Sequence, residues 1–229
     1  MYESLYEAFA QSSGDEGVGG GDYNEIGEIE LDVLRACGLQ PDSTLLDFGC
    51  GNGRLAIHAV PFLQHGKYVG VDIAPTFLAN AANRLRSVMA TGSCDVQLVH
   101  QVDERFSLPD DSIDMGCAFS VFTHMEHEDM YRYLTQLNRV VRPGGTMVIS
   151  CLPLDLDYAR VTFVKEAELD VAARWQRPRN VTTSVDLVNA IAQLAGWTVV
   201  RWLPGDEHQA SSEAGEPRSL GQSIAVLTH

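Results

Sequence analysis

The sequence lacks any long hydrophobic run. No apolar stretch approaches the roughly 20 residues that cross a bilayer, and the N-terminal segment MYESLYEAFAQSSGDEG is too polar and acidic for a signal or transit peptide. These absences predict a cytoplasmic protein that does not enter a membrane.

Paired cysteines are lacking as well. The five cysteines are odd in number and scattered, and none belongs to a CxxC pair, so neither a disulfide framework nor a zinc site is indicated. Two histidines, His124 and His127, have H-x-x-H spacing, which could present two nitrogens to a metal. The acids beside them, including Glu128, fit better in the first turn of a helix, where they complement its dipole. No bound metal is expected.

Positive charge is scarce. The chain has 31 acidic residues against 16 Lys and Arg, a formal net charge of −15. Because neutralisation of phosphates supplies most nonspecific affinity for nucleic acids, this charge opposes binding to DNA or RNA and favours a small-molecule partner. The segment RWQRPR at 174–179 is a local basic exception.

Strand-length apolar runs alternate with helical patterns. At 229 residues and 45% hydrophobic, the chain fits one domain. Strands are expected at 44–48, 67–73, 95–100, 112–119, 145–152, 197–203 and 222–228. Helices are expected at about 27–38, 53–64, 75–90, 126–141 and 184–195. This alternation predicts an α/β fold with a parallel, doubly wound sheet.

Three stretches interrupt the alternation. Residues 12–22 hold too many glycines for a helix or strand, and residues 204–221 are polar and rich in turn residues. Residues 153–183 have mixed periodicity and are the expected place for an inserted lid or substrate-selecting element.

The segment LLDFGCGNGR, residues 45–54, has the features of a ligand-binding turn. An apolar strand, a glycine turn and a helix N-terminus together leave backbone N–H groups free and side chains absent. A dinucleotide fingerprint would be G-x-G-x-x-G, but here the third glycine is Gly53 and Arg54 follows it. A pyrophosphate ligand, and with it a nicotinamide-dependent oxidoreductase, is therefore disfavoured.

Asp72 stands at the end of the next strand. A carboxylate there can accept both hydroxyls of a ribose, which together with the glycine turn predicts a nucleoside ligand without a phosphate. Asp72 by itself could equally be a turn or N-cap residue before the helix at 75–90.

Four motifs occur in the order typical of one family. They are LLDFGCGNGRLA, YVGVDI, LPDDSIDMGCAFSVFTHM and LNRVVRPGGTMVIS. Together they resemble the class I S-adenosylmethionine-dependent methyltransferases over residues 40–152. Upstream, VGGGDYNEIG and the downstream SVFTH resemble a small-molecule branch of that family.

The resemblance implies a Rossmann-like sheet, mostly parallel with an antiparallel last strand, and S-adenosylmethionine as cosubstrate. It places the glycine turn along the methionine part, Asp72 on the ribose, Ile73 on the adenine, Asp103 on the adenine amino group, and the end of the fourth strand beside the sulfonium. The implied cofactor-binding residues are Asp47, Gly49, Cys50, Gly51, Asp72, Ile73, Asp103, Phe119 and Ser120. Arg54 could hold a carboxylate or lie on the surface.

Methyl transfer is an in-line displacement at carbon, in which alignment does much of the work and a base is needed only for a protonated acceptor. His124 is the candidate base, because it follows the fourth strand and titrates near neutrality; it could instead order the chain by bonding to backbone. Residues 1–30 are expected to form an N-terminal lid, in which Tyr2, Tyr6 and Tyr23 contact the acceptor, over a domain of residues 31–229.

The acceptor is expected to be a small-molecule hydroxyl or amine, in specialised biosynthesis. Methyltransferases of exocyclic nucleobase amines carry an (Asp/Asn)-Pro-Pro-aromatic tetrad after the fourth strand, whereas this chain has Phe119, Ser120, Val121 and Phe122 there. A non-catalytic S-adenosylmethionine-binding regulator or partner subunit is the alternative. The expected assembly is a monomer or homodimer.

Overall fold

The computed structural model describes residues 2–13, 22–89, 93–103 and 105–229. Most of the glycine-rich stretch at 12–22, and the first residues of VGGGDYNEIG, lie outside these ranges. The strands are β1 (Thr44–Phe48), β2 (Lys67–Asp72), β3 (Asp95–His100), β4 (Ile113–Ala118), β5 (Val141–Cys151), β6 (Thr198–Leu203), β7 (Ala210–Ser211), β8 (Pro217–Arg218) and β9 (Ser223–Thr228).

Seven of these strands form one sheet in the order β3-β2-β1-β4-β5-β9-β6. Strands β1 to β5 pair in parallel, whereas β9 is antiparallel to both of its neighbours, β5 and β6. The expectation of a doubly wound, mostly parallel sheet with an antiparallel last strand is confirmed. The carboxyl ends of β1 to β5 therefore meet at one edge, where ligands bind in sheets of this kind.

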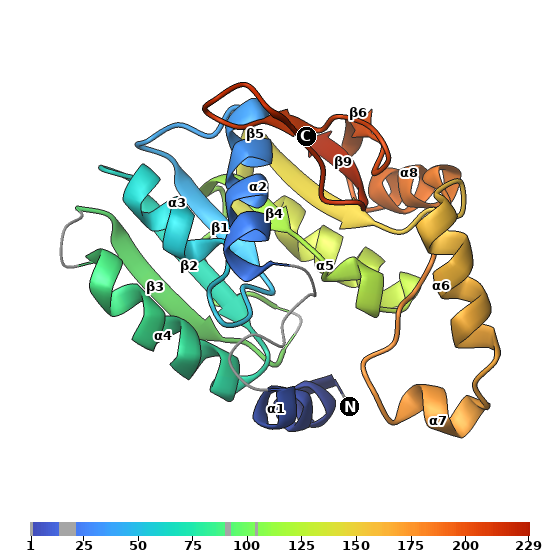
Figure 1. Cartoon of the computed structure of the whole chain (residues 1–229). Coiled ribbons are helices and arrows are strands. Elements are labelled where there is room, and N and C mark those ends of the chain that lie inside the picture. The colour runs from blue at the N-terminus through green and yellow to red at the C-terminus, as the bar shows by residue number, and fades with distance from the viewer. Residues whose placement is uncertain (1, 14–21, 90–92, 104) are drawn as a thin grey trace.

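Helices cover both faces of the sheet (Figure 1). They are α1 (Tyr2–Ser13), α2 (Tyr23–Ala36), α3 (Ala56–Phe62), α4 (Pro75–Met89), the short 3-10 helix η1 (Phe122–His124), α5 (His127–Val140), α6 (Asp157–Ala167), α7 (Val171–Trp175) and α8 (Val185–Leu194). One face packs against α5 and α8, and the other against α2 and α3.

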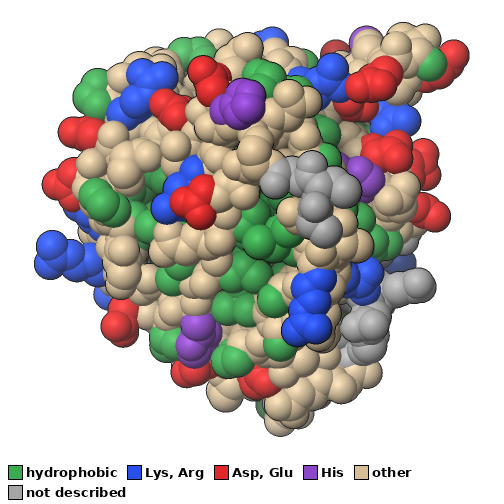
Figure 2. Space-filling view, turned by 90° about the vertical axis from the view of Figure 1, so that its left-hand side faces the viewer, with side chains coloured by type: hydrophobic (Ala, Val, Ile, Leu, Met, Phe, Trp, Pro, Cys, Tyr) green, Lys and Arg blue, Asp and Glu red, His purple; other side chains and the backbone are tan. Residues whose placement is uncertain are grey.

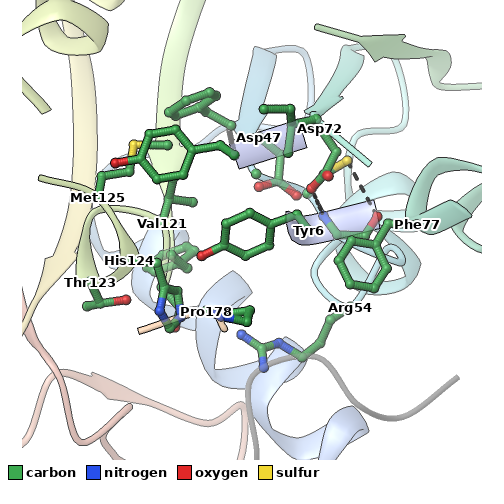
Figure 3. A pocket seen from close by; sticks show the side chains of 18 of the residues that line it. Tyr6, Asp47, Arg54, Asp72, Phe77, Val121, Thr123, His124, Met125 and Pro178 are labelled. Carbon is green, nitrogen blue, oxygen red and sulfur yellow. Dashed lines mark hydrogen bonds between the residues drawn. The ribbon is translucent and has the colours of Figure 1, made fainter. Parts of the chain in front are cut away.

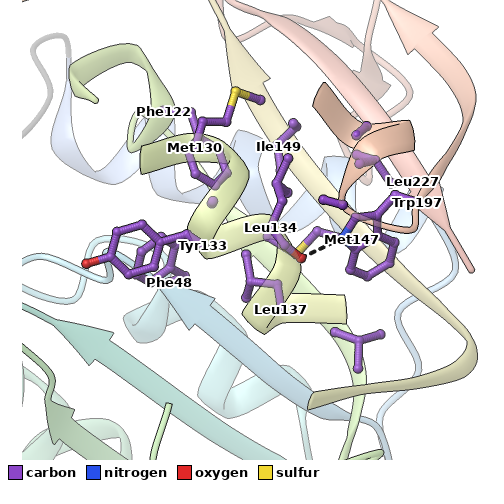
Figure 4. Close-up of a cluster of buried hydrophobic side chains, with 14 of the residues drawn as sticks. Phe48, Phe122, Met130, Tyr133, Leu134, Leu137, Met147, Ile149, Trp197 and Leu227 are labelled. Atoms are coloured by element: carbon purple, nitrogen blue, oxygen red, sulfur yellow. Dashed lines mark hydrogen bonds between the residues drawn. The ribbon is translucent and has the colours of Figure 1, made fainter. Parts of the chain in front are cut away.

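The amphipathic helix α5 shows how the sequence encodes this packing. Its buried residues Met130, Tyr133, Leu134 and Leu137 recur at intervals of three or four, so they share one face. Figure 4 shows them against β1, β5 and β9 in a closely packed cluster. The indole of Trp197 donates a hydrogen bond of 2.9 Å to the Leu134 carbonyl, which satisfies a buried N–H.

The elements expected from periodicity are all present, with shifted ends. Helix α2 begins at residue 23 instead of 27, because Asp22 caps it by accepting a hydrogen bond from the Glu25 N–H. Strand β5 begins at 141 instead of 145, and its register against β4 shifts between the pairs Ile113–Val141 and Met115–Thr146. The connection at 204–221 contains the small hairpin β7-β8.

Helix α1 has no counterpart among the helices expected from periodicity. It is held against two other elements: the Tyr2 hydroxyl donates to Asp129 over 2.8 Å, and Glu7 accepts from the Thr76 N–H over 3.1 Å. Helix α2, by contrast, packs its buried face into the sheet core. The expected boundary at residue 30 falls inside α2, so of the two described helices in this region α1 lies apart from the sheet core and α2 does not.

Residues 153–183 form α6, α7 and a returning segment that projects from the sheet (Figure 1). Backbone bonds pin the two ends together, Leu154 N–H to Thr183 over 3.0 Å and Thr183 N–H to Leu152 over 2.9 Å. The Val181 N–H also donates to the Thr123 carbonyl over 2.7 Å, which fixes the returning segment beside η1. Within the described residues, no helix is long and apolar enough to cross a membrane.

Candidate active site

The turn after β1 depends on its glycines. Gly49, Gly51 and Gly53 all have positive φ, at 78°, 53° and 88°. A Cβ on Gly49 would also overlap the side chain of Val121. The N–H groups of Gly49 and Cys50 donate to the Val71 carbonyl over 2.8 and 3.1 Å, so the turn folds back on β2.

Asp72 ties this turn to the start of α4. Its carboxylate is buried and accepts the N–H groups of Gly51 and Ala74, each over 2.8 Å. Burial raises the pKa of Asp72, and these backbone bonds oppose the rise. Each carboxylate oxygen has a second lone pair, so Asp72 can hold the turn and accept a ligand hydroxyl together.

Asp47 is buried at the same end of the site. It accepts the Tyr68 hydroxyl over 2.5 Å and the Cys117 thiol over 3.7 Å. Burial raises the pKa of Asp47 to about 7, against an ordinary value of 3.8, because the charged form is desolvated. A cation placed nearby would relieve that cost.

Arg54 is not a surface residue. It is 6% exposed, and its guanidinium pairs with the buried Glu30 of α2, from Nη2 to Oε1 over 2.5 Å and from Nε to Oε2 over 3.3 Å. Of the two possibilities left open by the sequence, the surface position is wrong, and the carboxylate that Arg54 holds belongs to this chain.

A cavity of about 600 Å³ opens at the carboxyl edge of the sheet. Its lining includes most of the residues expected at the site: Asp47, Gly49, Cys50, Gly51, Asp72, Ile73, Phe119, Ser120, Tyr2, Tyr6 and His124. The volume is typical of pockets for drug-sized ligands. The same space is therefore bordered by residues expected for the cosubstrate and for the acceptor.

Two expected site residues do not line this cavity. Asp103 lies beyond β3, where its carbonyl accepts from the Gln101 side chain over 2.8 Å, and Gln101 is the residue that reaches the cavity. Tyr23 donates to the Asn52 carbonyl over 3.2 Å and lies under the guanidinium of Arg84 at 4.6 Å. Tyr23 thus anchors α2 to the glycine turn.

A closed cycle of three hydrogen bonds joins Ser120, Ser150 and Gln222 at the ends of β4, β5 and β9. The Ser120 N–H donates to the Ser150 hydroxyl over 2.7 Å, that hydroxyl donates to Gln222 over 2.7 Å, and Gln222 donates to the Ser120 hydroxyl over 2.9 Å. Ser120 has a φ of 57°, rare for a residue with a side chain. No sequence signal pointed to Gln222, because antiparallel pairing brings it here from the end of the chain.

The other side of the cavity is formed by α1, η1 and the segment after α7. Figure 3 shows the Tyr6 ring extending across the cavity, away from Asp47 and Asp72 and toward Thr123 and His124. The rings of Tyr6 and His124 meet edge to face at 6.4 Å. The oxygens of the Tyr6 and Thr123 hydroxyls are buried and have no hydrogen-bond partner among the described residues.

The tautomer of His124 follows from its backbone contact. Its Nδ1 lies 2.8 Å from the Arg179 carbonyl, which can only accept, so Nδ1 carries the proton. Burial lowers the pKa of His124, which favours the neutral ring. In that form Nε2 has a free lone pair, as a general base requires.

The charges of the lining residues discriminate between ligands. The carboxylates that line the cavity are Glu30, Asp47 and Asp72, and only Glu30 is paired with an arginine there. The remaining two acids oppose a pyrophosphate and suit a cationic ligand. Within the described residues, no cluster of three or more His, Cys, Asp or Glu could hold a metal ion. The lining therefore fits a sulfonium nucleoside better than a dinucleotide.

Comparisons with known proteins agree with this geometry. Residues 45–145 match the family described as "Methyltransferase domain". Cyclopropane mycolic acid synthase 1 of Mycobacterium tuberculosis is 25% identical over 88% of this chain and 71% of that protein. Magnesium protoporphyrin IX methyltransferase from Synechocystis PCC 6803, solved with S-adenosylhomocysteine, superposes with a TM-score of 0.67 at 17% identity, covering 99% of both chains.

A further solved structure is described as "Conversion of a Disulfide Bond into a Thioacetal Group during Echinomycin Biosynthesis". It gives a TM-score of 0.68 at 17% identity and covers 100% of this chain and 93% of the other. The chain thus carries a methyltransferase domain with the class I fold. It is an enzyme of the class I S-adenosylmethionine-dependent methyltransferases, with S-adenosylmethionine as its cosubstrate.

Proposed function

We propose that this enzyme transfers a methyl group to a hydroxyl or amine of a small molecule in specialised metabolism. The carrying observation is one cavity of about 600 Å³, bordered by the glycine turn on one side and by α1, η1 and residues 177–180 on the other. A cavity bordered on both sides in this way suits two small ligands placed for direct transfer.

The cosubstrate supplies a methyl group on a positively charged sulfur. The glycine turn gives its backbone room, Asp47 offers negative charge toward the methionine end, and Asp72 accepts ribose hydroxyls. Phe119 and Ser120 border the sulfonium, where the Ser120 ring of hydrogen bonds keeps the end of β4 rigid. His124 takes the proton of a protonated acceptor at Nε2.

Two of the three arginines in the basic segment at 174–179 pair with carboxylates of this chain, which argues against nucleic acid as the acceptor. Arg177 pairs with the buried Glu166 at 2.9 Å, and Arg179 pairs with Glu126 at 2.8 Å. On the face shown in Figure 2, Lys and Arg side chains are scattered among acidic ones. With a net charge of −15, phosphate binding has little support.

The setting in specialised metabolism is supported by the fold-level likeness to the echinomycin-related structure. The similarity to a mycolic acid synthase favours a lipid as the competing acceptor class. A specialised metabolite and a lipid are both small compared with RNA or DNA. Either acceptor is compatible with a proposal in which the cavity selects the acceptor.

Titration calorimetry and methyl labelling test the proposal. S-adenosylhomocysteine should bind saturably and NAD should not. Labelled methyl groups from S-adenosylmethionine should enter a low-molecular-weight extract and not bulk tRNA, rRNA or DNA. Salt-sensitive labelling of any of these nucleic acids would reverse the proposed acceptor class.

A further inference from the structure

We call the part of the cavity lined by α1, η1 and residues 177–180 its acceptor side. Two hydroxyl groups there have no hydrogen-bond partner among the described residues. The Thr123 residue is 1% exposed, yet its hydroxyl has no partner among the described residues, and neither has the buried Tyr6 hydroxyl. A buried polar group without a partner destabilises the folded state. Tyr6 and Thr123 line the same cavity as His124, so two such hydroxyls there indicate a site whose missing partner is a ligand.

The three groups match the hydrogen-bonding pattern of a hydroxyl. A hydroxyl has one hydrogen to donate and two lone pairs to accept with. Its hydrogen can go to Nε2 of His124, and its lone pairs can accept from the hydroxyls of Tyr6 and Thr123. The Tyr6 hydroxyl stays protonated, because burial raises its pKa, and so remains a donor.

A protonated amine is a poor match for the same place. The three lining carboxylates, Glu30, Asp47 and Asp72, belong to the opposite side and are engaged by Arg54, by Tyr68 and by backbone N–H groups. Two further acids, Asp129 and Glu166, do not line the cavity. Asp129 accepts from the Tyr2 hydroxyl, and Glu166 pairs with Arg177 through Oε1, while its Oε2 has no partner among the described residues. A buried ammonium there would lack a counter-charge.

The surroundings of the three groups are largely aromatic. The lining includes Tyr2 and Tyr158 together with the Tyr6 ring. Flat aromatic molecules stack and pack edge to face against such side chains. A neutral imidazole is also better matched to a phenol, with a pKa of about 10, than to the far less acidic aliphatic alcohols.

We infer that the acceptor is a phenolic hydroxyl, recognised by Tyr6 and Thr123 and deprotonated by His124. This inference rests on the proposed function. The phenol O–H bond breaks and its proton goes to Nε2 of His124, while an oxygen lone pair forms the bond to the methyl carbon. The carbon–sulfur bond breaks with its electron pair going to sulfur, so the sulfonium becomes a neutral thioether and the product is an aryl methyl ether.

Three matched probes test the inference: 4-ethylphenol, 4-ethylaniline and 4-methylbenzylamine. Their binding is measured by saturation-transfer NMR on the full chain, with and without S-adenosylhomocysteine. The phenol should bind more tightly than either amine. Equal or tighter binding of an amine, or no binding of the phenol, overturns the inference.

Two variants remove the hydroxyls alone. Tyr6→Phe and Thr123→Val should each weaken phenol binding about 2- to 12-fold, as expected for one lost hydrogen bond. Neither variant should lower the affinity for S-adenosylhomocysteine or the midpoint temperature of thermal unfolding. Tyr131→Phe and Thr135→Val on the exposed face of α5 are the matched controls and should change nothing. Unchanged phenol affinity in both cavity variants contradicts the inference. If the wild-type protein does not bind S-adenosylhomocysteine, that result contradicts the proposed function instead.

Discussion

The two sides of the cavity are built in different ways. On the cosubstrate side, Asp47, the glycine turn and Asp72 lie within 26 residues of each other along the chain, and their polar groups bond to one another or to adjacent strands. On the acceptor side, Tyr6, Thr123 and Pro178 come from three distant segments. Two hydroxyls there are buried without a partner among the described residues.

On the cosubstrate side, the chain itself supplies the hydrogen-bond partners of the polar groups. On the acceptor side, a ligand would have to supply them. Polar groups satisfied by the chain hold their geometry before binding, which suits a cosubstrate that must be aligned. Unsatisfied groups cost stability, and they discriminate strongly between ligands that can and cannot pair with them. Substitutions on the two sides should therefore affect different steps.

The largest effect is expected on the acceptor side. His124→Ala should lower turnover roughly 10²- to 10⁴-fold, the usual contribution of a general base, with little change in affinity for S-adenosylhomocysteine. Steady-state kinetics of methyl transfer check this, and His65→Ala, at an exposed loop position, is the control. If turnover is retained and only the acceptor KM rises, His124 orders the loop through Arg179 and is not the base.

The pH profile gives a second check on His124. Burial lowers its pKa from the ordinary 6.5, so the neutral base persists to below that pH. Wild-type turnover should stay constant from pH 8 to about 6.5 and fall at lower pH as the imidazole protonates. A profile that does not fall would exclude the base role.

The next largest effect is expected on the cosubstrate side. Asp72→Ala should weaken S-adenosylhomocysteine binding by roughly 1 to 3 kcal/mol, because it leaves two backbone N–H groups and the ligand hydroxyls without their acceptor. Calorimetry measures the change, with Asp95→Ala, on the exposed edge of β3, as the matched control. An unchanged dissociation constant would remove Asp72 from the binding site.

The smallest effect concerns the protonation of Asp47. In the absence of ligand, its raised pKa means that the folded state holds a proton the unfolded state has lost, so its contribution to stability falls as the pH rises from 3.8 to about 7. A cationic ligand binds the ionised form instead. Affinity for S-adenosylmethionine, whose sulfonium is positively charged, should therefore rise about tenfold from pH 6 to pH 8 in calorimetry.

Asp47→Asn should abolish most of that pH dependence, because asparagine does not titrate. Asp95→Asn should preserve it. The same slope in wild type and in Asp47→Asn would assign the titration to another group.

Local patterns were sufficient for the strands, the glycine turn and the carboxylates at the strand ends. Each of these depends on residues close together in the sequence. The order of the motifs then indicated the class of enzyme and its cosubstrate. The adenine side was less accessible, since the residue that reaches the cavity is Gln101 and the expected Asp103 lies two positions beyond it. A shift of that size after a strand end depends on the path of the loop.

Helices α1, α6 and α7 were not expected from periodicity. Helix α6 leaves Tyr158, Val161, Phe163 and Val164 more than half exposed, so its apolar residues do not mark a buried face. Helix α1 packs mainly across the cavity mouth and α4, with a small buried cluster that includes Ala10 and Phe77. A helix that buries only a few residues shows a weak hydrophobic periodicity in its sequence.

The sequence by itself determined the order of strands and helices, the glycine turn and the placement of acids at one edge of the sheet, because hydrophobic periodicity and backbone conformation act over a few residues. Only the tertiary structure decided which polar groups would be satisfied. It paired Arg54 with Glu30 across 24 residues, brought Gln222 to Ser120 across 102, and left the hydroxyls of Tyr6 and Thr123 without a hydrogen-bond partner among the described residues. Hydrogen bonds and ion pairs between distant segments depend on the final packing of the chain, and no local pattern encodes them.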